Sequence, residues 1–343
     1  MGSPKVAFTF DDIAIMPAVY SKVKSRHDVD TTGMLHDIEL PLPLLSASMA
    51  AFDVLDGGIY LDFAKHMYHA GGMHVFSRRN SFYERVEVAS ELYDEGIEYG
   101  IAVSLFEFIS YRNILENLHC FISIDIANGA ILPDFHDWSG KYPLIVGNFG
   151  NPKAPMLRLR EDDSKDTYTI YKLGVGSGSA CTTRQVTGVG TPQAWLISEA
   201  RKYDVSAAII SDGGVNTPGD FCKALALGAD AVMCGSTLAA ARETPNEPVK
   251  IGDRWYKPYS GEASSEAKGG SSFIEGVSGF VQYEDKSVYD LLDEFSDGLK
   301  SSMTYVGVDN LIDFPDAAEI VMVSPTAVKE NGVRVYHDER NYR

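Results

Sequence analysis

The chain alternates between short apolar runs rich in β-branched residues and longer segments in which apolar residues recur at helical spacing. Most of the short runs are apolar at nearly every position, which is typical of parallel strands buried on both faces. Eight strands are expected, at residues 43–48, 73–77, 99–104, 120–126, 143–148, 170–175, 207–212 and 231–236. Helical patterns lie between most of them, at residues 60–69, 81–93, 106–118, 192–203 and 218–227.

Eight strands in β-α order favour an α/β fold, a (β/α)8 TIM barrel, over an open doubly wound sheet, which is the alternative. The 343 residues fit a barrel of roughly 250 residues with extensions. After the eighth strand, the pattern predicts a hairpin at 249–259, a Gly/Ser-rich stretch at 260–272 and a helix at about 287–300. We expect one catalytic barrel domain over residues 1–343, in which about 249–286 form a hairpin and short flap over the barrel mouth.

Charge and composition narrow the class of ligand. The chain has 48 acidic and 30 basic residues, a formal net charge of −18, which argues against nucleic acid as a partner. No apolar run reaches the ~20 residues that cross a bilayer, and the first residues lack the apolar core of a signal peptide. The four cysteines contain no C-x-x-C pair and the eight histidines no H-E-x-x-H. We therefore expect a reduced, cytoplasmic protein with no membrane partner and no zinc.

The most informative segment is 173–193, which reads LGVGSGSACTTRQVTGVGTPQ. Gly174, Gly176 and Gly178 follow a predicted strand, and they allow a sharp turn that aims backbone groups at a ligand. Cys181 then stands in a polar loop at the carboxyl end of that strand, a position suited to nucleophilic attack. The alternative is a buried, inert cysteine, which the Gly, Ser and Thr neighbours disfavour. The G-x-G-x-G spacing also differs from the dinucleotide fingerprint.

Two further strand ends carry glycines, at Gly213-Gly214 and at Gly235-Ser236. Backbone N–H groups after the seventh and eighth strands are a recurrent phosphate site in TIM barrels. We expect Ser179, Gly214, Gly235 and Ser236 to hold one phosphate together. Asp212, at the end of the seventh strand, is suited to accept hydrogen bonds from ribose hydroxyls. The alternative is that these glycines serve only tight turns between strand and helix.

Taken together, these motifs resemble the IMP dehydrogenase/GMP reductase family. The matching segments are TFDDI from Thr9, GVGSGSACTTRQVTGVGTPQ from Gly174, SDGGVNTPGDFCKALALGADAVMCGS from Ser211, EGVSGFVQY from Glu275, TYVG from Thr304 and DERNY from Asp338. The resemblance covers nearly the whole chain. It implies a TIM barrel, here without a CBS insertion, that acts as an oxidoreductase at C2 of a purine nucleotide monophosphate. It also implies a nicotinamide cofactor, NADPH or NAD, and a homotetramer.

The resemblance assigns roles residue by residue. Cys181 matches the nucleophile that forms a covalent thioimidate with purine C2, and Thr183 and Glu275 match the proton-transfer pair of the reductases. The residues that match substrate contacts are Ser179, Asp212, Gly214, Gly235, Ser236, Tyr259, Gly261 and Met49. Those that match the nicotinamide side of the cofactor site are Asp125, Asn128 and Gly129. The backbone carbonyls of Gly176, Gly178 and Cys181 match those that bind potassium in many members.

Within the family, the reductase branch is favoured. The dehydrogenases activate water with an Arg-Tyr dyad on a mobile flap, whereas the matching interval, 262–274, is short and holds neither Arg nor Tyr. GMP reductase converts GMP, NADPH and a proton into IMP, ammonia and NADP⁺. IMP dehydrogenase, which converts IMP, NAD⁺ and water into XMP and NADH, is the alternative because 275–283 and 330–342 look more like that branch. A catalytically idle nucleotide-binding member is a further alternative.

Several positions depart from the family pattern. Ala50 follows Met49 where an Asp is usual, and Glu262 stands where a Met usually touches the base. Ser272 and Ile274 replace the Arg and Ser that reductases usually carry near the guanine. These departures leave open whether the substrate is a ribonucleotide, a deoxyribonucleotide or a nucleotide with a modified base, and which nicotinamide cofactor is used. Glu262 has an equally simple interpretation as a surface carboxylate on a mobile loop.

Overall fold

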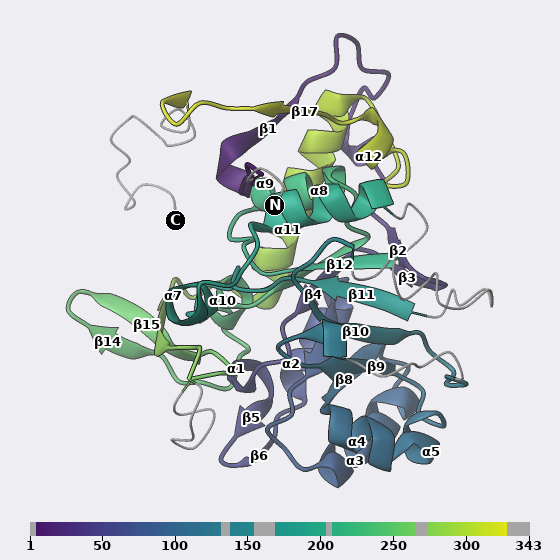
Figure 1. The fold of residues 1–343 in the computed structure, drawn as a ribbon, viewed down its shortest axis with the longest axis vertical. Helices are drawn as coiled ribbons and strands as arrows, with labels where there is room; N and C mark the ends of the chain where they lie inside the picture. Colours follow the sequence, from purple (N-terminus) through teal and green to yellow (C-terminus); the bar gives the residue numbers. More distant parts are fainter. Residues whose placement is uncertain (1–4, 132–137, 154–168, 204–207, 265–273, 328–343) are drawn as a thin grey trace.

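A closed barrel of eight parallel strands forms the centre of the computed structural model, which describes residues 5–131, 138–153, 169–203, 208–264 and 274–327 (Figure 1). Around the barrel the order of strands is β10-β11-β12-β13-β4-β7-β8-β9. Their bounds are β4 Leu44–Ser46, β7 Met73–Phe76, β8 Tyr99–Val103, β9 Phe121–Asp125, β10 Leu144–Phe149, β11 Thr169–Leu173, β12 Ala208–Asp212 and β13 Ala231–Cys234. All eight predicted strands and the TIM barrel are thus confirmed, and the open sheet is wrong.

Helices lie between the strands where the apolar spacing predicts them. Four agree closely with prediction, namely α2 Asp62–His69, α3 Phe82–Asp94, α8 Gln193–Tyr203 and α9 Pro218–Ala226. The helix predicted at 106–118 is instead two short helices, α4 Leu105–Ser110 and α5 Arg112–Leu115. Tyr111 leaves helical geometry between them and stacks on Phe82, with ring centroids 4.3 Å apart. This stacking with the neighbouring helix α3 is a tertiary contact that local spacing does not reveal.

The two ends of the chain meet on one side of the barrel. The strand β1 (Ile13–Met16) pairs antiparallel with β17 (Glu319–Met322), about 300 residues away in sequence (Figure 1). The long helix α11 (Val288–Val306) corresponds to the helix predicted at about 287–300, continues beyond it and packs on α9, and Ser287 is its N-cap. The remaining short elements are η1 Phe10–Asp12, η2 Arg26–Asp28, β2 Gly33–Leu35, β3 Ile38–Leu40, β5 Val54–Leu55, β6 Gly58–Ile59, η3 Gly129–Ile131 and α12 Phe314–Ala317.

A three-stranded antiparallel sheet lies at the carboxyl ends of the barrel strands. The predicted hairpin is confirmed as β14 (Val249–Ile251) and β15 (Arg254–Ser260), and β16 (Ser278–Tyr283) adds a third strand. The sheet contacts α1 (Ala50–Asp53) and α10 (Ser236–Ala239), the helices that directly follow β4 and β13 (Figure 1). The sequence interval 265–273, which holds most of the expected flap, and the tail 330–342 lie outside the described residues. The division into domains therefore stays a prediction.

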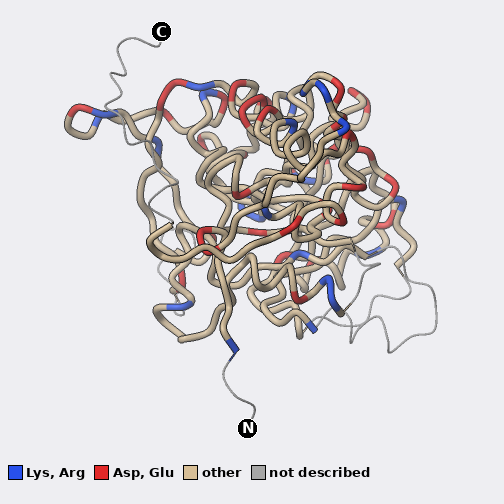
Figure 2. The backbone as a smooth tube through the Cα atoms, turned by 90° about the horizontal axis from the view of Figure 1, so that it is seen from above, with Lys and Arg blue, Asp and Glu red and all other residues tan. Residues whose placement is uncertain are grey.

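The interior of the barrel changes from apolar to polar along its axis. Its buried layers are built from Leu45, Met73, Val75, Ala102, Phe121, Ile145, Ile170, Ile210, Ala231 and Met233. Two residues beyond Ile170 and Ile210, on the same face of their strands, stand Lys172 and Asp212, and Asp125 ends β9 on the corresponding face. This change places the polar groups at the carboxyl end of the barrel. Among the residues that the structure describes, Asp and Glu occur along many parts of the chain rather than in one segment (Figure 2).

A fully buried carboxylate joins α1 to the end of β7. The carboxylate of Asp53 accepts a hydrogen bond from Ser77 Oγ at 2.8 Å and another from the Ser77 backbone N–H. His74 Nε2 lies 3.6 Å from the same carboxylate, and all three side chains are fully buried. Because buried polar groups that lose their partners keep their desolvation penalty, this cluster stabilises the fold only while it is complete.

We expect the substitution Asp53→Ala to lower the free energy of unfolding by about 2–4 kcal/mol, since it leaves two buried donors of Ser77 without an acceptor. Urea denaturation followed by circular dichroism measures the change. The control Glu87→Ala removes an exposed carboxylate from α3 and should change stability by less than about 0.5 kcal/mol. Equal effects of the two substitutions would contradict this account of the Asp53 cluster.

Candidate active site

Cys181 lies in the loop between β11 and α7 (Thr183–Thr187), at the carboxyl end of the barrel. Its thiol donates a hydrogen bond to Thr183 Oγ1 at 3.1 Å. The other three cysteines, Cys120, Cys222 and Cys234, are buried, whereas Cys181 is partly exposed. The structure therefore places Cys181 as the sequence predicts, in reach of a ligand at the barrel mouth and beside a hydroxyl.

The backbone around Cys181 is fixed to the segment that precedes β16. Cys181 forms an antiparallel bridge with Gly276, the Thr182 N–H donates to the Glu275 carbonyl at 2.9 Å, and the Val277 N–H donates to the Ala180 carbonyl at 2.9 Å. A Cβ atom on Gly276 would lie 2.9 Å from the backbone nitrogen of Ser264, so only glycine fits there. The backbone of Glu275 therefore lies beside the segment that carries Cys181 and Thr183, although more than 90 residues separate Cys181 from Glu275 in the sequence.

The four cysteines differ in burial, and we therefore expect them to differ in reactivity toward alkylating reagents. It raises the pKa of Cys120 and of Cys222 to about 12, and it also raises the pKa of Cys234 above its ordinary value. We expect iodoacetamide at about pH 8 to add one carbamidomethyl group per folded chain, at Cys181, because only the thiolate reacts. Intact mass spectrometry and peptide mapping measure this, with the variant Cys181→Ala as the control that takes up none. An adduct on another cysteine of the folded chain would contradict the prediction.

Several of the expected substrate contacts surround the Tyr259 hydroxyl. This hydroxyl donates to Met49 Sδ at 3.2 Å and is hydrogen-bonded to Ser179. Gly235 faces it so closely that any Cβ there would clash with the hydroxyl oxygen. Burial raises the pKa of Tyr259, so that the hydroxyl stays a protonated donor at neutral pH. Four predicted residues, from the loops after β4, β11 and β13 and from β15, therefore meet at one point.

The loops after β12 and β13 lie side by side. Gly213 and Gly214 both have positive φ, at 93° and 79°, which glycine alone adopts readily. Thr237 Oγ1 donates to the Asn216 carbonyl at 3.4 Å and so joins the Gly214 loop to the start of α10. Gly214 and Ser236 are thus on adjacent segments, although their contact with a phosphate remains a prediction.

An ion cluster that the sequence analysis did not identify closes the barrel below the mouth. Lys172 Nζ lies 2.6 Å from Asp125 Oδ1 and 3.5 Å from Asp212 Oδ2, while Asn148 Nδ2 donates to Asp212 Oδ2 at 2.7 Å. Burial by itself would raise the pKa of Asp125, but the charges of Lys172 and Arg78 outweigh it and hold the pKa below its ordinary value. In the sequence, the one indication of this cluster is that a lysine, Lys172, lies within a strand that is otherwise largely apolar.

On the expected cofactor side, the residues at and just after the end of β9 have different contacts. Asp125 faces the barrel mouth, where Ser48 Oγ donates to its Oδ2 at 3.2 Å. Asn128 Oδ1 accepts the Ala130 N–H at 3.1 Å in a local turn. Gly129 packs against Phe149, where a Cβ would lie 2.8 Å from a ring carbon. The structure thus makes Asp125 available to a ligand, whereas Gly129 shapes the backbone.

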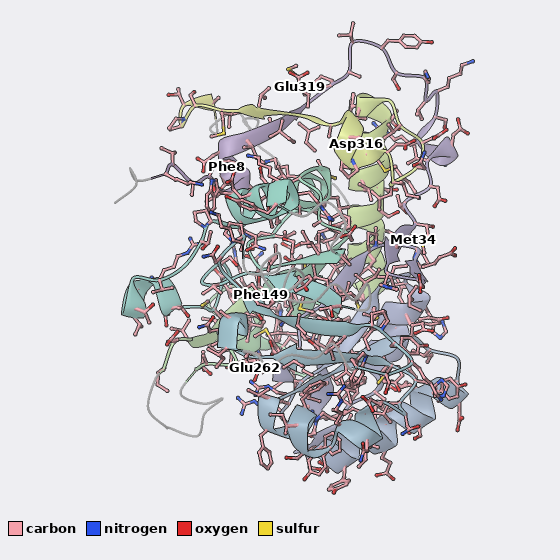
Figure 3. The ribbon with its side chains drawn as sticks, turned by 45° about the vertical axis from the view of Figure 1, so that its right-hand side comes forward. Phe8, Met34, Phe149, Glu262, Asp316 and Glu319 are labelled. Carbon is pink, nitrogen blue, oxygen red and sulfur yellow. The ribbon has the colours of Figure 1, made fainter. Side chains whose placement is uncertain are left out.

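Glu262, the main departure from the family pattern, lies within the mouth. Its Oε1 accepts the Ala50 N–H at 3.3 Å and its Oε2 lies 3.6 Å from Arg79 Nε. The neighbouring Gly261 donates its N–H to the Val277 carbonyl at 3.1 Å, and its backbone packs against Ala180. Burial raises the pKa of Glu262, and Arg79 offsets part of that shift. The contacts favour a role at the mouth over a freely solvated surface carboxylate (Figure 3).

In the described ranges, no three His, Cys, Asp or Glu side chains converge in a way that could hold a metal ion. The expected potassium ligands are carbonyls: that of Gly178 accepts the Cys181 N–H at 3.0 Å, and Gly176 packs against Arg184. Among the helices that the structure describes, none combines the length and apolar character that a membrane crossing requires.

Comparisons with known proteins agree with this architecture. Residues 120–334 match the model of the IMP dehydrogenase / GMP reductase domain. A GMP reductase of Clostridium acetobutylicum is 33% identical over 96% of this chain and 99% of its own length, and one of Lactobacillus acidophilus is 31% identical over 95% and 96%. An inosine-5'-monophosphate dehydrogenase of Korarchaeum cryptofilum is 36% identical over 55% of this chain and 42% of its own length. The chain therefore belongs to the IMP dehydrogenase / GMP reductase family.

Proposed function

We propose that this protein is a GMP reductase, an oxidoreductase that converts GMP, NADPH and a proton into IMP, ammonia and NADP⁺. The observation that carries the proposal is the joining of Cys181, Thr183 and Glu275 at the barrel mouth, through the 3.1 Å thiol–hydroxyl contact and the backbone bond from Thr182 to Glu275. It is supported by the near full-length match to relatives named GMP reductase. The short 262–274 interval without Arg or Tyr also favours it.

In the proposed reaction Cys181 Sγ adds to C2 of the guanine, the carbon that bears the amino group. Thr183 and Glu275 pass a proton to that amino group, which leaves as ammonia when the C2–N bond breaks. NADPH, when bound, supplies the hydride that C2 accepts. The C2–S bond then breaks and the sulfur leaves as a thiolate, which yields IMP and restores the enzyme.

The remaining residues bind and orient the two ligands. We propose that the N–H groups of Gly214, Gly235 and Ser236, with the hydroxyls of Ser179 and Tyr259, hold the phosphate. Asp212 would accept the ribose hydroxyls, and Met49 and Gly261 would lie along the base. The nicotinamide side fits Asp125 best, since its carboxylate is ionised and partly exposed at the mouth. Asn128 and Gly129 would shape that side of the site.

A potassium ion at the carbonyls of Gly176, Gly178 and Cys181 is part of the proposal. The Gly178 carbonyl already accepts one hydrogen bond, and its second lone pair is free to coordinate a cation. The homotetramer and the cytoplasmic location also stand as proposals. Turnover in K⁺ compared with Na⁺, and light scattering after gel filtration, test the ion and the assembly.

One assay distinguishes the candidate reactions. Absorbance of the reduced nicotinamide is followed with GMP and NADPH, with GMP and NADH, with dGMP and NADPH, and with IMP and NAD⁺, while ammonia is measured in parallel. Oxidation of NADPH with GMP and release of one ammonia per turnover supports the reductase. Reduction of NAD⁺ by IMP would instead establish the dehydrogenase, which the dehydrogenase-like sequence of 275–283 favours. No turnover in any arm, with nucleotide binding retained, would establish an idle member.

A further inference from the structure

A buried lysine lies beneath the two ligand-facing carboxylates of the site. The side chain of Lys172 is 2% exposed, whereas those of Asp125 and Asp212 are 16% and 21% exposed. The carboxylates therefore reach the mouth from below while the ammonium stays inside the barrel. The proposed chemistry at Cys181 makes no use of this lysine, so its place in the site needs a separate explanation.

The neighbouring strand is adapted to the path of the Lys172 side chain. Asp125 ends β9 and Lys172 is on β11, so the lysine must cross β10, which lies between them. It crosses at Gly147, where an added Cβ would lie 2.6 Å from Lys172 Cβ and 3.2 Å from its Cε. Any other residue at 147 would block the lysine stem. The glycine and the lysine therefore form one structural unit.

Each carboxylate is held by the lysine and by one further donor. Ser48 Oγ donates to Asp125 Oδ2 at 3.2 Å, and Asn148 Nδ2 donates to Asp212 Oδ2 at 2.7 Å. The ammonium is 2.6 Å from the first carboxylate and 3.5 Å from the second, and so acts as a counter-ion for both. Without it, two negative charges would share a partly buried region, an arrangement that like-charge repulsion disfavours.

We propose that Lys172 is a positioning residue that links the nucleotide-ribose site at Asp212 to the cofactor site at Asp125, so that binding of one ligand favours binding of the other. This inference rests on the proposed function, in which the two carboxylates accept hydroxyls from the two ligands. A ligand that orders one carboxylate also fixes the ammonium, which then fixes the second carboxylate. The coupling free energy must be reciprocal between the two ligands.

The same geometry predicts a pH signature. The groups that face Asp125 are Lys172 from β11, Ser48 after β4, Arg78 after β7 and Glu262 after β15. Burial alone would raise the pKa of Asp125, and Lys172 is the largest of the charges that lower it. Removal of the ammonium should therefore let Asp125 take up a proton at higher pH. This shift reports the charge of Lys172 on Asp125, and the coupling factor between the two ligands then separates a linking role from a purely structural one.

The test compares Lys172→Met, which keeps the stem without the charge, with Lys172→Arg, which keeps the charge. Calorimetric titrations measure the Kd of GMP and of NADP⁺, each alone and in the presence of the other, from about pH 5 to pH 9. In Lys172→Met we expect each Kd to rise about tenfold or more and the coupling factor to fall to about 1. The acid limb of NADP⁺ binding should move to higher pH, and Lys172→Arg should keep the coupling.

Controls separate positioning from folding and from the proposed function. If circular dichroism shows that Lys172→Met is unfolded, Lys172→Gln replaces it in the same titrations. In an Asp125→Asn background, Lys172→Met should change the coupling factor no further. A folded Lys172→Met or Lys172→Gln protein that keeps the wild-type coupling factor would overturn the Lys172 proposal alone, whether or not its acid limb moves. A wild-type protein that binds neither GMP nor NADP⁺ would overturn the proposed function, and the coupling with it.

Discussion

Turnover of purine nucleotide is expected to vanish in Cys181→Ala, with kcat lower by at least about 10⁴-fold, as is usual when a covalent nucleophile is removed. In the proposed reaction, C2 of the guanine accepts a hydride only after its amino group has been displaced, and that displacement requires a group that both attacks and leaves well. A thiolate does both, whereas alanine offers no lone pair. The decay of NADPH absorbance with GMP measures the loss, and titration of GMP binding should show a Kd within about threefold of wild type.

The matched control is Cys222→Ala, which removes a buried thiol from α9, away from the mouth. Its kcat should stay within about threefold of wild type, because a small cavity in the helix layer affects stability rather than chemistry. Mass spectrometry of enzyme quenched during turnover should find the nucleotide adduct on the peptide that carries Cys181. Turnover in Cys181→Ala above about 1% of wild type would contradict covalent catalysis by this residue.

The barrel is predictable because its signals are local. Strands buried on both faces have short apolar runs, and the helices between them have apolar residues at helical spacing. The bounds of the eight predicted strands therefore agree with the observed ones to within a few residues. The prediction of one helix at 106–118 is wrong because of a non-local contact: Tyr111 stacks on Phe82, which belongs to another helix. The pairing of β1 with β17 is equally invisible, because each is four residues long and its partner lies at the other end of the chain.

The site divides in the same way. Motifs at strand ends predict the positions of Cys181, Gly214 and Gly235. The fold then brings the segments that carry these residues to one end of the barrel. Lys172 and Asn148 carry no such motif, because their significance depends on which strands are neighbours in the closed barrel. Asp53 also carries no motif, and only the folded structure places it in a buried contact with Ser77.

The substitution Glu275→Gln tests the step that distinguishes the proposed reductase from its sister reaction. Ammonia leaves carbon only when the nitrogen is protonated, so loss of the acid should slow release of the amino group. We expect kcat to fall about 10²–10³-fold, within the usual range for a positioned acid or base. NADPH oxidation and ammonia release should fall together, and the Kd of GMP should change by less than about threefold because the amide keeps the shape of the side chain.

Glu284→Gln is the matched control, since it neutralises an exposed glutamate just beyond β16 that accepts a bond from Gln282 and pairs with Lys286. It should leave kcat unchanged, which separates a local proton transfer from a general loss of negative charge. If Glu275→Gln retained wild-type turnover, the proton would have to come from elsewhere, and the backbone bond that holds Glu275 beside Thr182 would have a structural purpose alone. If instead Glu275→Gln and Thr183→Ala each slowed ammonia release and the double variant slowed it no further, the two residues would act as one relay, as the proposed reaction requires.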